Sequence, residues 1–196
     1  MLRHRILTGL LALSCGAAAI AFNLPSSRQA PQATASHARL MEAVGDWKGT
    51  LTMWMGAPEP VKTECTETVR AIGELWTTSV FRCSFQGEPF EGCSTNGFDP
   101  KKGKYVSTWI DSMTSSLTVM EGEWNEETQT TIMDYEGLDP FTGQLVPMRS
   151  EAKGNDKSMS ISFFKMVDGN PERTMQIDMQ KVRASEAAEA SSDRGK

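Results

Sequence analysis

The sequence predicts an all-β fold, an up-and-down antiparallel β-barrel of about ten strands that follows one short helix. From Trp47 to Arg183, apolar and polar residues alternate with the period of two that is typical of half-buried strands. The segments between these runs are short and rich in Gly, Asp, Asn and Pro, which favour hairpin turns. A long meander must hide its edge strands, and closure into a barrel achieves this most simply. A two-sheet β-sandwich is the alternative fold.

The first 22 residues have the parts of a secretory signal peptide. A basic segment, residues 3–5, precedes an uncharged apolar run of 17 residues at 6–22, and small residues suited to cleavage recur at 17–21 and 33–35. We therefore expect residues 1–22 to be removed during export to the periplasm or the cell exterior. Retention as an N-terminal membrane anchor is one alternative, and lipidation at Cys15 is another.

The rest of the chain divides into a leader, one folded domain and a tail. Residues 23–35 are rich in Pro, Ser and Gln, and residues 184–196 in Ala, Ser and Glu, so we expect both segments to be disordered. Residues 36–183 form the single β-barrel domain, which is long enough to bury roughly 68–70% of its unfolded surface. No other apolar stretch approaches the length of a membrane span, so the mature chain is expected to have none.

The charge balance argues against nucleic acid and anionic membranes as partners. The chain has 20 basic and 25 acidic residues, and loss of Arg3 and Arg5 with the signal peptide leaves 18 against 25, a net charge of −7. The cluster of Lys101, Lys102 and Lys104 falls at a predicted turn, where it is expected to be a solvated loop tip. Binding to phosphates would need a larger basic surface.

The elements follow in order along the chain. Ser36 is the expected N-cap of a helix at 37–44, which Gly45 ends. At 86–89, Gly87 suits the first central position of a type II′ hairpin turn. The expected strands are 47–55, 61–72, 76–85, 90–98, 104–111, 116–124, 128–135, 144–153, 157–167 and 173–183.

Several segments resemble a known bacterial family. These are Gly45-Asp46-Trp47, Asn96-Gly97-Phe98-Asp99, the segment 104–113 (KYVSTWIDSM) and the segment 137–143 (GLDPFTG). Together they are similar to the family catalogued as domain of unknown function 1579, over about residues 37–183. The resemblance implies a calycin-like or lipocalin-like β-barrel. It implies no activity, substrate or catalytic residue.

The residue types available for catalysis are few. The chain has two histidines: His4 lies in the predicted signal peptide, and His37 lies on the predicted helix or leader. A barrel without a strand histidine argues against catalytic triads, His-based zinc sites and haem ligation. The acidic cluster of Asp134, Glu136 and Asp139 does not have the spacing of an EF-hand. We therefore predict no metal, cofactor or catalytic residue, and a non-enzymatic role is favoured.

Alternation along the strands selects a candidate ligand-binding set. It places Trp109 and Asp111 on the inner face of the barrel if Ile110 faces outward. The buried carboxyl would then need a partner, either a ligand group or, in a structural role, an Arg or backbone amides. The candidate ligand-binding residues are Trp47, Met53, Phe81, Phe85, Trp109 and Asp111.

The leading hypothesis is therefore a barrel that binds a small apolar or amphipathic ligand. Many of the 12 methionines fall in the predicted strands, where they suit either a loosely packed core or an adaptable lining. One alternative is a structural or protein-interaction module of the cell envelope with a filled barrel. A second alternative is an enzyme that uses carboxylates alone.

Three cysteines remain in the predicted mature chain: Cys65, Cys83 and Cys93. A three-residue loop at 73–75 would set Cys65 directly across from Cys83, with Cβ atoms about 4.5–5.5 Å apart. In the next hairpin, Cys83 is expected to face Gly92, and Cys93 to project to the other side. Cys65 and Cys83 are therefore the pair expected to lie closest, either bonded or as two thiols, and Cys93 is expected to be left as a thiol.

The first prediction concerns processing. Because the basic segment, the apolar run and the cleavage sites occur in order, the mature protein should begin between Ile20 and Ser36. Amino-terminal sequencing of the exported protein checks this expectation. Recovery of a chain that begins at Met1 from a membrane fraction would show that the segment is an anchor instead.

Overall fold

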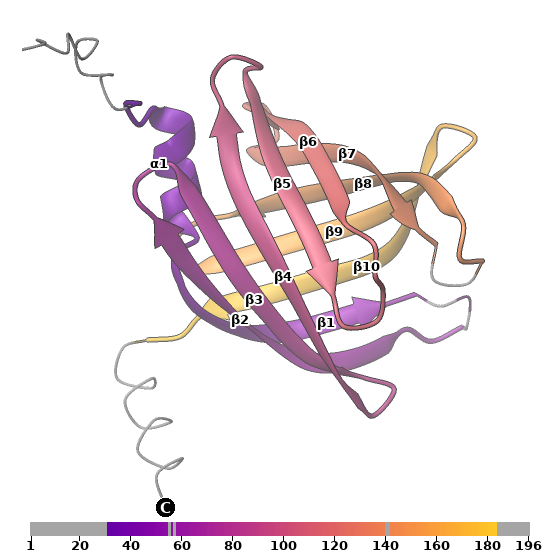
Figure 1. Ribbon diagram of the computed structural model, residues 1–196. Helices are drawn as coiled ribbons and strands as arrows, with labels where there is room; N and C mark the ends of the chain where they lie inside the picture. Colours follow the sequence, from indigo (N-terminus) through magenta and orange to yellow (C-terminus); the bar gives the residue numbers. More distant parts are fainter. Residues whose placement is uncertain (1–30, 55, 57, 140–141, 184–196) are drawn as a thin grey trace, which may run out of the picture. The chain divides into compact units, whose positions relative to one another are not determined.

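A computed structural model describes residues 31–54, 56, 58–139 and 142–183, which form a closed ten-stranded antiparallel barrel after one helix (Figure 1). Each strand pairs with the next, and β10 pairs with β1. The predicted barrel is therefore confirmed, and the sandwich alternative is wrong. The predicted signal peptide and tail lie outside the described residues. The elements are α1 Ala35–Glu42, β1 Gly45–Met53, β2 Val61–Ile72, β3 Trp76–Phe85, β4 Glu88–Asp99, β5 Lys104–Asp111, β6 Thr118–Asn125, β7 Thr130–Leu138, β8 Leu145–Gly154, β9 Ser158–Val167 and β10 Asn170–Lys181.

Helix α1 begins earlier than predicted, at Ala35, and its N-cap is Thr34 instead of Ser36. The imidazole Nδ1 of His37 lies 3.0 Å from the amide nitrogen of Thr34 and 2.8 Å from its hydroxyl. His37 thus supplies the acceptor that Glu or Gln supplies in a usual capping box. The predicted N-cap Ser36 was therefore wrong, and residue 35, which was assigned to the leader, belongs to the helix.

The β3–β4 hairpin also differs from its prediction. Its loop is Gln86-Gly87, with φ angles of 52° and 91°, so both central residues are left-handed as in a type I′ turn. The predicted Gly87-Glu88 loop was wrong by one position, and the register shifts by two residues. Cys83 therefore lies across from Phe90, and Gly92 lies across from Phe81. Because the shift is even, the residues on each face are unchanged.

The strand register shows which side chains share the inner face. Directly opposed residues lie on the same side of a sheet, and Trp47 is 1% exposed. Starting from Trp47, one row of opposed residues on the inner face crosses six strands. We call it the Glu67 row, and it comprises Lys181, Trp47, Glu67, Phe81, Gly92 and Asp111. By the same reasoning the inner face carries Met53, Met120, Met133, Met148, Met159, Met175 and Met179.

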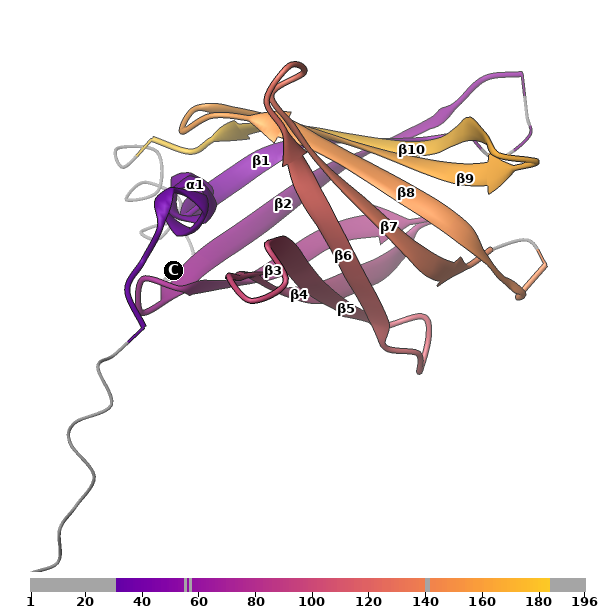
Figure 2. The same ribbon diagram turned by 90° about the horizontal axis from the view of Figure 1, so that it is seen from above.

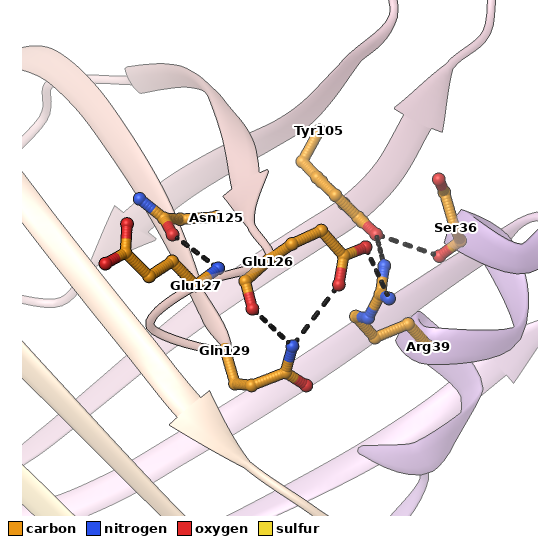
Figure 3. Close-up of polar contacts among 7 residues, drawn as sticks. All are labelled: Ser36, Arg39, Tyr105, Asn125, Glu126, Glu127 and Gln129. Atoms are coloured by element: carbon orange, nitrogen blue, oxygen red, sulfur yellow. Dashed lines mark hydrogen bonds and ion pairs between the residues drawn. The ribbon is translucent and has the colours of Figure 1, made fainter.

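Helix α1 covers one end of the barrel (Figure 2). Its Arg39 guanidinium donates a hydrogen bond to the Tyr105 hydroxyl of β5 at 3.0 Å, and that hydroxyl donates to the Ser36 carbonyl at 3.4 Å (Figure 3). The same guanidinium carbon lies 3.9 Å from the centroid of the Trp124 ring on β6. Arg39 also lies 3.8 Å from the Glu126 carboxylate in the β6–β7 turn. Arg39 therefore connects the helix to the β5–β6 side of the barrel.

Contacts to the β1–β10 pair fix the other end of the helix. The Trp47 indole donates to the Ala43 carbonyl at 2.8 Å. The Lys181 ammonium donates to the Glu42 carbonyl at 2.9 Å and lies 4.9 Å from the centroid of the Trp47 ring. These bonds satisfy carbonyls at the helix C-terminus that have no partner within the helix. Helix and barrel consequently share one buried core at this end.

The second prediction tests this closure. Arg39→Ala removes a partly buried hydrogen bond and a cation–π contact, so the free energy of unfolding should fall by about 1–2 kcal/mol. Arg82→Ala is the matched control, because Arg82 pairs with Glu91 at 2.6 Å on the surface and both side chains are more than half exposed. The control should lose less than about 1 kcal/mol. Urea unfolding measures both, and equal losses would contradict a special role for Arg39.

Candidate functional site

All six residues of the predicted ligand-binding set lie on the inner face, but the structure does not bring them all together. Trp47 and Met53 are six residues apart on β1, a separation of about 20 Å along the strand. Trp47 is also enclosed between the helix and Lys181. A small ligand can therefore contact only some of these six residues. The whole set is Trp47, Met53, Phe81, Phe85, Trp109 and Asp111.

Phe81, Phe90 and Trp109 form an aromatic cluster on the β3–β5 wall. The ring centroid of Phe81 lies 6.2 Å from that of Phe90 and 6.4 Å from that of Trp109, and both pairs are edge-to-face. The Trp109 ring occupies the space above Gly92, where an added Cβ would lie 2.2 Å from a ring carbon. The cluster therefore depends on a glycine on the neighbouring strand. Sequence reasoning did not include Phe90, although alternation along β4 could have found it.

Asp111 has a structural role: the partners of its carboxylate are an indole and backbone amides, which was one of the two arrangements considered for it. One carboxylate oxygen accepts a hydrogen bond from the Trp109 indole at 3.0 Å. The other accepts from the backbone amides of Met113 and Thr114, both at 2.9 Å. Ile110 is 52% exposed on the outer face, as the prediction required. Asp111 therefore orients Trp109 and holds the β5–β6 loop.

Glu67 is the acidic group that sequence reasoning missed. On the inner face, the other charged residues of the described strands lie within two positions of a strand end, whereas Glu67 lies in the middle of β2. It sits across from Trp47 on one side and Phe81 on the other. Burial raises the pKa of the Glu67 carboxyl, and a hydrogen bond with the Ser79 side chain acts in the opposite direction. The alternation that selected Phe81 on β3 could, applied to β2, also have identified Glu67.

A chain of hydrogen bonds continues from Glu67 across three strands. The hydroxyl oxygens of Ser79 and Ser94 lie 2.8 Å apart. The Asn96 side-chain amide donates to Ser94 at 2.8 Å and accepts from the Ser107 hydroxyl at 2.7 Å. Ser79 and Ser107 are 1% and 4% exposed. The inner wall thus has a polar band toward the helix end and an aromatic cluster toward the opposite end.

Strands β2 and β3 separate beside this site. Their pairing begins at Cys65 and Cys83, although β2 starts at Val61 and β3 runs to Phe85. A depression of about 250 Å³ lies where they part, lined by Glu64, Cys65, Thr66, Arg82 and Cys83. The two cysteines therefore lie beside a break in the barrel wall, one inner-face position from Glu67.

A second separation, which we call the β6–β7 seam, lies across the barrel. Pairing of these strands begins at Glu121 and Asp134, although β6 starts at Thr118 and β7 runs to Leu138. The adjacent β5–β6 hairpin presents exposed apolar side chains. They are Ile110, Met113, Leu117 and Val119, with exposed fractions of 52–62%.

Two acidic residues of the predicted cluster near β7, Asp134 and Asp139, are held by basic partners. Asp134 accepts from Arg149 at 2.8 Å, and the 3%-exposed carboxylate of Asp139 forms an ion pair with Lys165. Within the described residues, no group of three or more His, Cys, Asp or Glu side chains is arranged to hold a metal ion. The described part of the chain also lacks a helix with the length and apolar character needed to cross a membrane.

Comparison with known families agrees with the barrel. The model of the family described as "Protein of unknown function (DUF1579)" matches residues 32–181. The chain belongs to this family. Among solved structures, the DUF1579 chain is similar to the one titled "Crystal Structure of Rv2717c from M. tuberculosis", with 13% identity and a TM-score of 0.58 over 78% of this chain and 100% of that one. This likeness concerns the fold. No curated protein matches the chain.

The cysteines of this DUF1579 barrel match the prediction for Cys65 opposite Cys83 and for Cys93 on the other face, but not for Cys83 opposite Gly92. Cys65 is directly across from Cys83, whereas Cys93 pairs with Val80 and Ile110 on the outer face. All three are free thiols in the structure. Burial raises the pKa of Cys65 to about 12, with smaller contributions from Cys83, Glu67 and Asp178. Burial also raises the pKa of Cys83.

The third prediction concerns these thiols. At pH 8 a maleimide should modify Cys93 first and Cys65 last, because the Cys65 thiol is buried and protonated. After treatment with oxidised glutathione, non-reducing peptide mapping should recover Cys65 bonded to Cys83. Recovery of Cys93 in an intramolecular disulfide would contradict the register.

Proposed function

We propose that this barrel binds a small amphipathic molecule and performs no chemistry on it. The observation that carries the proposal is the position of Glu67, a carboxyl in the middle of an otherwise largely apolar inner wall. The apolar part of the ligand would lie against the aromatic cluster and the inner methionines. Its polar end would reach Glu67 and the hydrogen-bonded serines. Ligand sites commonly combine an apolar lining with a few convergent polar groups.

Unequal burial around the barrel supports a solvent-accessible interior. On β10 and β1, Met179 and Trp47 are each 1% exposed. On β9, the inner-face residues Met159, Ile161 and Phe163 are only partly buried. Apolar side chains that face inward in a closed barrel yet stay partly exposed border space that a ligand can occupy. A barrel of more than eight strands is wide enough for one small molecule.

The openings of the wall support an amphipathic ligand. Helix α1 covers one end, so a ligand would enter at the opposite end or through the sides. The exposed apolar residues of the β5–β6 hairpin lie beside the β6–β7 seam. Such a cluster of exposed apolar side chains on a soluble domain typically marks a binding surface. A molecule with an apolar part would gather there before entry.

The arrangement favours binding over a carboxylate enzyme. Glu67 and Asp111 are three strand spacings apart in the Glu67 row, about 14 Å along the sheet. Glycosidase carboxyl pairs lie within about 5–9.5 Å of each other. Asp111 is also occupied by three hydrogen-bond donors. We also propose that the protein is exported and acts in the periplasm or outside the cell, because its amino-terminal segment has the features of a signal peptide.

The fourth prediction tests lumen binding with the neutral fluorescent probe N-phenyl-1-naphthylamine. The parent should increase its fluorescence with a micromolar Kd, and Trp109→Ala should weaken binding about tenfold. Trp76→Ala is the matched control, because Trp76 is 39% exposed and covers Gly97 on the outer face. If Trp109→Ala lowers the circular-dichroism melting temperature steeply, Trp109→Phe replaces it.

Absence of any fluorescence change with the folded parent would reject lumen binding. The same result would be expected if the interior is filled and the barrel serves as a protein-interaction module. Equal weakening by Trp109→Ala and Trp76→Ala would place the probe elsewhere.

A further inference from the structure

We infer that the polar end of the ligand is a cationic ammonium group, which Glu67 binds as an ion pair inside the barrel. This inference rests on the proposed function and specifies its ligand class. It is argued from the inner wall, where one carboxyl lies in the middle of a strand directly across from Phe81, a member of the aromatic cluster. Aromatic ring faces attract ammonium groups, and a carboxylate adds a charge-assisted hydrogen bond.

The basic groups of the inner face are engaged elsewhere. Lys165 forms an ion pair with the buried carboxylate of Asp139. Lys181 donates to the Glu42 carbonyl at the helix end and covers the Trp47 ring. Among the described residues, Glu67 forms no ion pair, and its hydrogen-bond partner is the neutral Ser79. A ligand cation would therefore meet a carboxyl whose charge is uncompensated.

The aromatic cluster supplies the second contact for such a cation. Phe81 is directly opposed to Glu67, and its ring packs edge-to-face with the rings of Phe90 and Trp109. Gly92 continues the Glu67 row on the next strand, and the Trp109 ring fills the space above it. The ring faces of Phe and Trp attract cations, most strongly away from water. An alkylammonium could therefore place its charge at Glu67 and its chain along the cluster.

Charge also decides against an anionic ligand. Besides Glu67, the inner face carries the carboxylates of Asp111 and Glu172 as well as the two engaged lysines, and neighbouring Cys65 is a neutral thiol. A ligand carboxylate near Glu67 would repel its charged form and would bind only with a proton taken up. A ligand ammonium is instead attracted by the charged carboxylate and binds without proton uptake. Burial raises the pKa of Glu67, and an ammonium that stabilises the carboxylate lowers it again, so binding favours release of a proton from this carboxyl.

The experiment compares three ten-carbon ligands that differ only in the head group: decylammonium, decanol and decanoate. Each displaces N-phenyl-1-naphthylamine from the full-length mature protein at pH 7. Decylammonium should displace the probe at a concentration at least about tenfold lower than decanoate, with decanol between them. Glu67→Gln should bring the three within about twofold of each other. Glu64→Gln is the matched control, since Glu64 is exposed on the outer face of the same strand, and it should keep the parent's order.

A second measurement does not depend on a variant. Calorimetry of decylammonium binding at pH 5.5, in two buffers that differ in ionisation enthalpy, should show proton release. Decanol should show none. If Glu67→Gln fails to fold, this calorimetric comparison decides the question on the parent protein, and absence of proton release with decylammonium would overturn the inference.

The outcomes separate the two proposals. If all three ligands displace the probe but decanoate does so as well as decylammonium, or if Glu67→Gln keeps the parent's preference, the ammonium inference is wrong and lumen binding stands. If neither the probe nor any ligand binds, both are wrong. A preference for decylammonium that Glu64→Gln also abolishes would place the cation on the outer surface and would likewise overturn the inference.

Discussion

The pairing of β1 with β10 is the constraint on which the rest of the structure depends. It runs without interruption from Trp47 and Lys181 to Met53 and Met175, and it removes both edges of the sheet. The two strands approach so closely at Gly49 that an added Cβ would lie 1.9 Å from the Asp178 carbonyl oxygen. A glycine is therefore needed where the barrel closes. Once closed, every second side chain of every strand must share one interior.

Closure makes the polar residues of the inner face informative. In a confined interior a polar group needs a partner, and most of the inner polar groups have one. Ser79, Ser94, Asn96 and Ser107 satisfy one another. The buried Trp124 indole N–H lacks a partner among the described residues, and Glu67 has only a hydroxyl. A carboxyl at this position destabilises the barrel relative to an apolar residue, which is typical of a group kept for binding.

The fold followed from the sequence because its two signals are local. Period-two alternation and turn residues act within a few positions, so they gave ten strands, the bounds of β2, β3 and β5, and the inner face of Trp109. Features that depend on a single turn were less predictable. Gln86 in a left-handed conformation moved the β3–β4 loop by one residue, and His37 replaced Glu in the helix cap. Neither exception to the residue preferences could be read from the pattern.

The candidate site was predicted less completely because proximity across strands depends on register. Trp109 and Phe81 meet through Gly92, a contact that the predicted register of β4, shifted by two residues, would not have produced. Asp111 was considered both as a structural carboxyl and as a ligand-binding group, and three nearby donors occupy it. Whether a carboxylate is occupied by its own loop is decided by backbone amides, which the side-chain pattern does not reveal. Glu67 lies mid-strand, beyond the reach of any turn amide, so its charge remains available.

Different residues of the inner wall provide apolar contact with a ligand and discrimination between ligands. Methionine side chains are flexible and polarizable, so they adapt to apolar groups of different shape. Seven inner positions carry methionine, and such a wall distinguishes poorly between alkyl chains of similar length. Glu67 acts differently, because electrostatic interactions strengthen as water is excluded and change sign with the ligand charge. Discrimination in this barrel should therefore depend on the charge of the ligand's head group far more than on the shape of its apolar part.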